Sequence, residues 1–190
     1  MIMGLVFALL RAAPTRFISW PTAFLIEFIR DTPLLIQLYL AYYGFAFVPG
    51  IQDTWLWEYF RDPFVPALLA FVLNTAAYTT EIFHGAIQST PKGEMEAARA
   101  YGMSRGKMMR RIILPSAFRR ALPAYGNEVI FMLHASAICS VVTLLDLTGA
   151  ARDIYARFYA PFEAFLFVAA IYLCLTFTII AIFRQLEKRL

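Results

Sequence analysis

The chain has 190 residues, of which 61% are hydrophobic and only 16% charged, whereas a soluble domain is close to a quarter charged. This composition excludes an ordinary soluble domain and indicates a protein whose solvent is a lipid bilayer. The net charge is only +4, and the basic residues cluster as a membrane topology requires, which argues against nucleic-acid binding. Cys139 and Cys174 lie in separate apolar runs, so neither a disulfide framework nor a zinc site is predicted.

In chain order, the first apolar run covers residues 1–10 and ends at Arg11. As a helix it reaches about 15 Å, half of the hydrocarbon core. Residues 17–30 mix apolar side chains with Trp20, Glu27 and Arg30, which predicts an interfacial elbow. Four complete spans then follow, at about 33–48, 64–85, 122–145 and 161–183. The predicted fold is an all-α bundle of membrane-spanning helices that forms one transmembrane domain over residues 1–190.

The connections between these runs differ in charge. The segment 49–62 carries tryptophans and an acidic balance, as an external interfacial loop would. Most of the 17 Lys and Arg residues lie instead in the long polar segment 88–120, beside the first turn, or at the C-terminus. Because basic residues accumulate in cytoplasmic loops, we expect segment 88–120 and the C-terminus to be cytoplasmic.

Segment 88–120 is long enough to carry internal helices, which indicates a docking element. Thr90 and Pro91 have the chemistry of a helix N-cap and first helical position. Gly102 suits the left-handed residue that follows a helix C-terminus. Ser104 can cap a second helix over 105–114, which Pro115 would end. The sequence therefore predicts a helix, a sharp turn and a second helix.

The side chains of this segment suggest how it would meet a partner. Ala97 and Ala98 are small and would allow a close approach, and Glu96 offers a hydrogen-bond acceptor. Glu96-Ala97-Ala98 is followed after three residues by Gly102, and after nine more by Ile112-Ile113-Leu114-Pro115. This pattern resembles the "EAA" signature of binding-protein-dependent ABC importer permeases of type I, whose fold is the MetI-like one. A generic basic loop lying on anionic headgroups would explain the charge, but not the spacing.

The resemblance carries implications for the site and its partners. It implies that the segment is a coupling helix seated in a cleft of an ABC ATPase dimer, and that Glu96 and Gly102 fix the docking geometry. It also implies a location in the bacterial inner membrane, alternating access, and a periplasmic solute-binding protein that delivers an amino acid. ATP and magnesium would be used by the ATPase, and this chain would bind no cofactor or metal.

Two further segments are similar to the polar amino acid branch of this family. Residues 30–38 resemble its R-x-T-P-L-x-x-Q pattern, and residues 74–87 resemble its A-A-Y-x-x-E-x-x-R-G-A-I pattern, with His84 in place of a frequent arginine. Through residues 123–130 and 151–154 the resemblance is greatest to M-type subunits of histidine/lysine/arginine/ornithine and octopine/nopaline uptake systems, which pair with a homologous Q-type permease; a homodimer is the alternative. Such permeases begin earlier, so we expect an in-frame upstream extension of about 30 apolar residues.

The chain shows no ATPase site of its own. A phosphate loop needs four residues between its two glycines and a Ser or Thr after its lysine. Here only three residues separate Gly102 from Gly106, and Met108 follows Lys107. His84 and His134 are too far apart in sequence to indicate a local metal site. Energy for transport is therefore expected from a partner.

Ionisable and polar residues within apolar runs are candidates for a substrate pathway. One helical face carries Asn74, Tyr78, Glu81 and Gly85. Glu81 on this face could meet a cationic substrate. The alternative is that these side chains form hydrogen bonds between helices, or that the Glu81 carboxylate snorkels to the membrane interface. Glu128 and Asp146 are further candidates, but each could pair with a basic residue: Arg119, Arg120 or Arg152. Ser136 and Ser140 have the spacing of close helix packing, and His134 is expected to be a hydrogen-bonded interior histidine.

Two other classes of protein remain open at this point. An ion-gradient-driven amino acid transporter usually shows paired repeats and broken helices at the midplane, and neither is visible in this sequence. A membrane scaffold without transport activity would not need the coupling segment.

Overall fold

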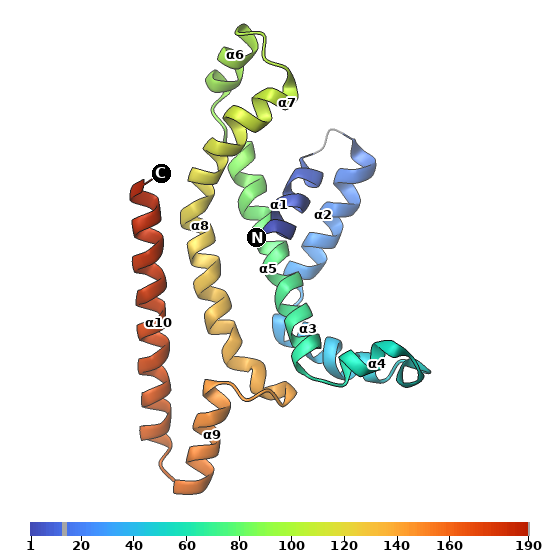
Figure 1. Cartoon of the computed structure of the whole chain (residues 1–190), viewed down its shortest axis with the longest axis vertical. Coiled ribbons are helices and arrows are strands. Elements are labelled where there is room, and N and C mark those ends of the chain that lie inside the picture. Colours follow the sequence, from blue (N-terminus) through green and yellow to red (C-terminus); the bar gives the residue numbers. More distant parts are fainter. Residues whose placement is uncertain (13–14, 190) are drawn as a thin grey trace. The chain divides into compact units, whose positions relative to one another are not determined.

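The computed structural model describes residues 1–12 and 15–189, and in this part of the chain it contains helices and turns without a strand. Figure 1 shows their course. The α-helices are α1 (Ile2–Arg11), α2 (Arg16–Asp31), α3 (Leu34–Tyr39), α4 (Trp55–Phe60), α5 (Phe64–Gln88), α6 (Lys92–Ala100), α7 (Arg105–Met108), α8 (Leu114–Ala135), α9 (Leu147–Phe158) and α10 (Pro161–Arg189). π-turns η1 (Leu40–Gly44) and η3 (Met109–Ile113) follow α3 and α7, and 3₁₀ helices η2 (Ile51–Asp53) and η4 (Ser136–Val142) precede α4 and follow α8. The all-α prediction is confirmed.

The chain divides into two compact units. Unit 1 contains Met1–Phe28, Thr75–Glu128 and Ile180–Leu190, and unit 2 contains Ile29–Asn74 and Val129–Ile179. Both units are built from small and apolar side chains, as expected for helices that pack closely in a bilayer. Ala8, Phe83, Ala117 and Ala121 are buried together in unit 1, whereas Leu38, Ala67, Ala70 and Val142 form the core of unit 2.

Among the described residues, three helical segments are long and apolar enough to cross a membrane: α5, the continuous run Arg105–Val142, and α10. They contain the predicted spans at 64–85 and 161–183, and most of the one at 122–145. The predicted span at 33–48 is instead the short helix α3 with π-turn η1. Four complete spans therefore remain a prediction. Helix α1 has the half length that its ten-residue apolar run indicated.

The span predicted at 122–145 ends earlier than expected. The α-helix stops at Ala135, the chain continues as η4, and Thr143 adopts a left-handed conformation with φ of +68°. Asp146 then caps a helix that was not predicted, α9, by accepting a hydrogen bond from the Gly149 N–H at 2.5 Å. Because an aspartate at the N-cap satisfies an otherwise unpaired backbone donor, Asp146 has a structural function at this position.

Helix α1 approaches α5 closely at Gly4. The Thr80 hydroxyl of α5 donates a hydrogen bond to the Gly4 carbonyl at 3.1 Å. A Cβ atom added at Gly4 would lie 2.6 Å from the Thr79 Cβ, whose side chain is fully buried. The contact therefore depends on the absence of a side chain at Gly4.

Replacing Gly4 by alanine is expected to destabilise unit 1 by about 1–3 kcal/mol, because overpacking forces the neighbouring helix to move. Thermal unfolding of the purified protein in detergent would measure the loss. Gly85→Ala is the matched control, since nothing lies within 4 Å of a Cβ at that position. Equal stability of the two variants would contradict the proposed close contact.

Candidate functional site

Helices α6 and α7 form a helical hairpin, defined here as residues 92–113, with a small core of its own. Ala98, Met108 and Ile113 are buried together, and partly buried neighbours complete this core: Ile87, Met95, Met103, Met109 and Ile112. Because α6 has only nine residues, it would be marginal as an isolated helix in water. Packing against α7 therefore holds α6 in place.

The turn between the two helices is a Schellman motif centred on Gly102. The Gly102 N–H donates to the Arg99 carbonyl at 2.9 Å, and the Met103 N–H donates to the Ala98 carbonyl at 3.1 Å. These are the two hydrogen bonds that define the motif, and Met103 also packs against the hairpin core beside Ala98. Gly102 has φ of +68°, so the predicted left-handed glycine is confirmed.

The predicted partner-facing residues divide into two groups. Glu96 and Ala97 are exposed, whereas Ala98 is only 2% exposed and belongs to the hairpin core. The idea that both alanines face a partner is therefore wrong for Ala98, because its methyl group fills the space between α6 and Met108. Tyr101 beside them is 86% exposed, and nothing in its sequence pattern had indicated a large aromatic side chain on this surface.

The capping details of the hairpin differ from the prediction. Thr90 does not cap α6: its hydroxyl donates to the Ile87 carbonyl at 2.7 Å, and Pro91 occupies the N-cap position. The second helix does not end before Pro115 either. It continues into α8 because π-turn η3 widens the helix just before this proline, which reduces the clash that a proline ring makes with the preceding turn. Of the remaining motif residues, Ile112 and Leu114 are partly buried and Pro115 is exposed.

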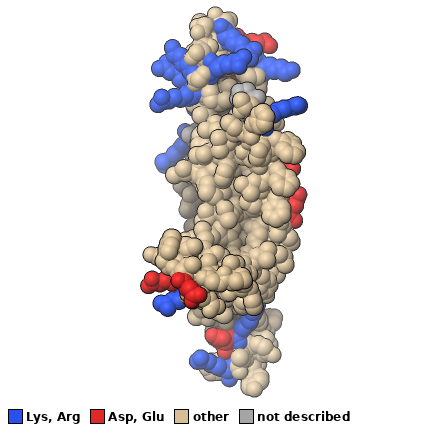
Figure 2. Space-filling model, turned by 90° about the vertical axis from the view of Figure 1, so that its right-hand side faces the viewer, with Lys and Arg blue, Asp and Glu red and all other residues tan. Residues whose placement is uncertain are grey.

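Basic side chains surround the hairpin. Figure 2 shows Lys and Arg gathered around α6 and α7, and the basic residues of this segment are Lys92, Arg99, Arg105, Lys107, Arg110 and Arg111. Apart from Glu94, exposed Glu96 is thus the one acidic residue of a hairpin whose other charged side chains are basic. Such a surface suits a partner that presents both acidic groups and a donor to Glu96.

The intramembrane candidates make specific contacts within each unit. In unit 1, Glu81 pairs with Arg11 of α1, and Arg11 also lies 3.3 Å from Glu27 of α2. Tyr78 is half-buried on the same helix as Glu81, and Glu128 of α8 is buried. Sequence reasoning missed Arg11 as the partner of Glu81, because seventy residues separate the two in the chain.

In unit 2, buried Asn74 donates a hydrogen bond to the Gln37 side-chain oxygen at 3.2 Å. The Gln37 amide in turn donates to the Ile29 carbonyl at 2.6 Å and the Thr32 carbonyl at 2.8 Å. Gln37 therefore satisfies carbonyl groups where the chain breaks between α2 and α3. This contact corresponds to the interhelical hydrogen bonding that was the alternative to a pathway function for Asn74.

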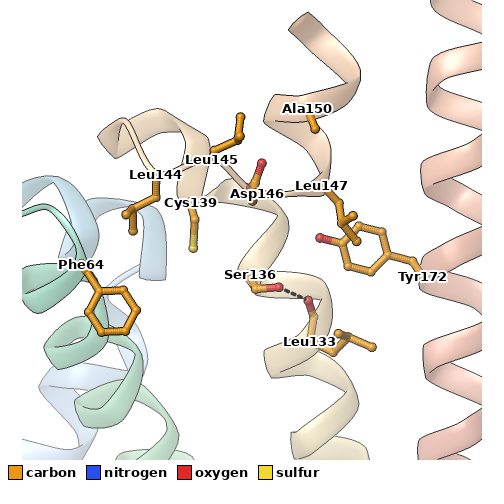
Figure 3. Close-up of a pocket in the computed structure, with 10 residues that line it drawn as sticks. All are labelled: Phe64, Leu133, Ser136, Cys139, Leu144, Leu145, Asp146, Leu147, Ala150 and Tyr172. Carbon is orange, nitrogen blue, oxygen red and sulfur yellow. Dashed lines mark hydrogen bonds between the residues drawn. The ribbon is translucent and has the colours of Figure 1, made fainter. Parts of the chain in front are cut away.

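Unit 2 also contains a pocket of about 580 Å³. Figure 3 shows its lining, which is mostly apolar and includes the Asp146 carboxylate and Tyr172. The Asp146 oxygens accept hydrogen bonds from the Gly149 and Ser140 backbone N–H groups. Ser140 lies in η4 and packs closely, as predicted, but its neighbour is α9. A Cβ atom built at Gly149 of α9 would lie only 3.0 Å from the Ser140 Cβ.

His134 lies 3.0 Å from the Thr176 hydroxyl and is exposed, not interior.

Residues 1–12 and 15–189 contain no group of three or more His, Cys, Asp or Glu side chains placed to hold a metal ion. The five pathway candidates do not form one cluster within either unit, since Asn74 and Asp146 belong to unit 2 and the other three to unit 1. The best-defined surface feature is therefore the hairpin, with its exposed Glu96 and Ala97.

Long apolar helices and a polar, basic helical hairpin together define a multi-helix membrane protein. The chain belongs to the family of binding-protein-dependent transport system inner membrane components, whose sequence profile matches residues 1–190. It is 47% identical over 189 residues to the histidine/lysine/arginine/ornithine transport system permease protein HisM of Escherichia coli K12, covering 99% of this chain and 79% of that protein. It is 46% identical over 173 residues to the nopaline transport system permease protein NocM of Agrobacterium fabrum, covering 90% and 72%.

Solved structures agree with this assignment. The crystal structure of an amino acid ABC transporter with histidines has a TM-score of 0.84 and 37% sequence identity, covering 100% of this chain and 84% of that one. An inward-facing form of the MetNI methionine ABC transporter has a TM-score of 0.77 at 18% identity, covering 99% and 86%. The second likeness concerns the fold alone, and it agrees with the MetI-like fold that was predicted.

Proposed function

We propose that this chain is the permease subunit of an ATP-driven importer for polar amino acids, basic ones among them, and that the hairpin 92–113 is where a separate ABC ATPase docks. The observation that carries the proposal is the exposed Glu96–Ala97 surface, which the Schellman turn at Gly102 and the Ala98 core hold in a fixed shape. The names of the relatives, which are permeases for basic amino acids and opines, support the substrate class.

The partners and topology follow from the same proposal. An ATPase dimer supplies ATP and magnesium chemistry, a periplasmic solute-binding protein delivers the substrate, and a Q-type permease or a second copy completes the pathway. The hairpin and the C-terminus face the cytoplasm of an inner membrane, in keeping with their basic residues. Alternating access exposes the pathway to each side of the membrane in turn. Glu81, Tyr78, Asn74, Glu128 and Asp146 are retained as candidates for contacts along that pathway.

Uptake by the reconstituted complex tests this function. The subunit, its cognate permease partner and its ATPase are placed in proteoliposomes, and the binding protein is added outside with labelled arginine, lysine, histidine, ornithine, glutamine or octopine. We expect uptake of the basic substrates that requires internal ATP and survives ionophores. Uptake that collapses with ionophores and persists without ATP would instead indicate an ion-gradient-driven transporter.

Replacing Glu96 by alanine is expected to lower ATP-coupled uptake at least about tenfold, because the partner loses one hydrogen bond to a charged acceptor, worth about 1.5–3 kcal/mol. Glu94→Ala is the control, since Glu94 lies two residues before Glu96 and therefore on the other side of α6, and its side chain is half-buried. The assay compares initial uptake rates at equal amounts of assembled complex. Wild-type uptake by Glu96→Ala would remove Glu96 from the docking site.

A further inference from the structure

A second feature of unit 1 lies at the base of the hairpin, where the chain leaves α5 and returns in α8. Arg120 of α8 reaches back to the end of α5. Its guanidinium donates to the Ala86 carbonyl from Nε at 3.3 Å and from Nη2 at 3.0 Å, and also to the Thr90 hydroxyl at 2.8 Å. A fourth bond runs from Nη1 to the Ser116 hydroxyl at 2.5 Å. One side chain therefore joins the entry and the exit of the hairpin.

The chemistry of these acceptors explains why an arginine is needed. The last carbonyl groups of a helix have no intrahelical partner, and Ala86 lies in the last turn of α5, which ends at Gln88. A cation at a helix C-terminus also meets the negative end of the helix dipole. The planar guanidinium presents several donors in a fixed fork, so it can reach Ala86, Thr90 and Ser116 together. A lysine ammonium has a single point of attachment and cannot span the same acceptors.

Apolar packing extends the same connection. Ala86, Ala117 and Ala121 are buried in one cluster with Phe83, so the end of α5 and the start of α8 are already in contact. Ile87 packs against this cluster and also against the hairpin core of Ala98, Met108 and Ile113. The two ends of the hairpin segment are thus held together in two ways. Buried alanines pack the end of α5 against the start of α8, and Arg120 joins the same two helices by hydrogen bonds.

We propose that Arg120 is a positioning residue that locks the two ends of the hairpin segment together, so that a displacement of α6 by the ATPase moves α5 and α8 as one body. This inference rests on the proposed function, because it concerns how the docking site transmits force. Without Arg120, the hairpin could still bind the ATPase through Glu96. A displacement of α6 would then no longer move α5 and α8 together, because their ends would be free to separate.

The test measures substrate transported per ATP hydrolysed in the reconstituted complex. We expect Arg120→Ala to hydrolyse ATP within about twofold of the wild type while its uptake falls about tenfold, since several charge-assisted hydrogen bonds are lost together. Arg120→Lys is expected to recover only part of the ratio. Thr90→Val removes one acceptor without changing charge and is expected to lower the ratio about threefold. It also keeps the proposal testable if Arg120→Ala does not fold.

Arg119→Ala is the matched control, because Arg119 is the adjacent, exposed arginine of the same helix, and its ratio is expected to equal that of the wild type. A wild-type ratio in both Arg120→Ala and Thr90→Val would overturn the proposal. A parallel fall of hydrolysis and uptake at constant ratio would also overturn it, since that result indicates failed assembly. Failure of the wild-type complex to couple ATP to uptake would contradict the proposed function itself, and so the two failures are distinguishable.

Discussion

Replacing Gly102 by valine is expected to reduce ATP-coupled uptake by about 100-fold or more, because a β-branched residue strongly disfavours the left-handed backbone that ends α6. Gly102 has φ of +68°, yet a Cβ built on it would meet no atom within 4 Å. The cost therefore comes from the local backbone conformation and not from a clash with another part of the protein. When the chain avoids this conformation, both hydrogen bonds of the Schellman turn are lost, and α6 leaves its place on Ala98 and Met108.

The identity of the substitute at Gly102 provides the sharper test. Asparagine tolerates the left-handed region far better than alanine or valine, so uptake is expected to fall in the order glycine, asparagine, alanine, valine. Gly93→Ala is the control, since Gly93 lies in α6 with open space around it and without a positive φ. Uptake rates and ATPase binding by the purified complex would be measured together. Equal loss in the asparagine and valine variants would show that the conformation of this turn is not what matters.

The features of the hairpin that could be predicted from sequence are local ones. A glycine after a helix, an aspartate or serine before one, and a run of apolar residues each act within a few residues of their own position. The turn at Gly102, the helix through Glu96 and the half-length α1 were accessible for this reason. The division between exposed Ala97 and buried Ala98 was not, because it depends on how α7 packs against α6.

The unpredicted parts of the fold have two different physical causes. Helix α9 had a local signal, since Asp146 is an N-cap residue, but its carboxylate was interpreted as a group facing the pathway. The contacts of Arg11 with Glu81 and of Arg120 with Ala86 and Thr90 had no local signal, since these partners lie 70, 34 and 30 residues away. From the sequence, Arg11 was only a positive charge that sets orientation and Arg120 a possible partner of Glu128 or Asp146, whereas in the structure each joins two helices of unit 1.

Removing Arg11 is expected to destabilise unit 1 by about 2–4 kcal/mol, because breaking a partly buried ion pair withdraws the counter-ion from a carboxylate. The side chains of Arg11 and Glu81 are 16% and 25% exposed. Arg11→Ala withdraws the cation from two carboxylates, Glu81 and Glu27, whereas Glu81→Gln leaves Arg11 beside Glu27. We therefore expect Arg11→Ala to cost more than Glu81→Gln in thermal unfolding of the detergent-solubilised protein.

Glu27→Gln is the control for this pair, because the Glu27 side chain is 57% exposed and an exposed ion pair contributes about 0–1 kcal/mol. A cost for Arg11→Ala no greater than that of Glu27→Gln would contradict the ion pair. The double variant Arg11→Met with Glu81→Met is expected to regain most of the stability lost in Arg11→Ala, since it removes both charges and retains apolar volume.

The double variant also separates the two roles that Glu81 could have. Its fold no longer depends on the ion pair, so a change in the KM for a cationic amino acid could not be attributed to lost packing between α1 and α5. A raised KM for arginine but not for glutamine would indicate that Glu81 faces the substrate and that Arg11 is its counter-ion between transport cycles. An unchanged KM for both would mean that Glu81 serves to hold α1 against α5. The pathway carboxylate would then have to be sought at Glu128, which is buried on α8, or at Asp146.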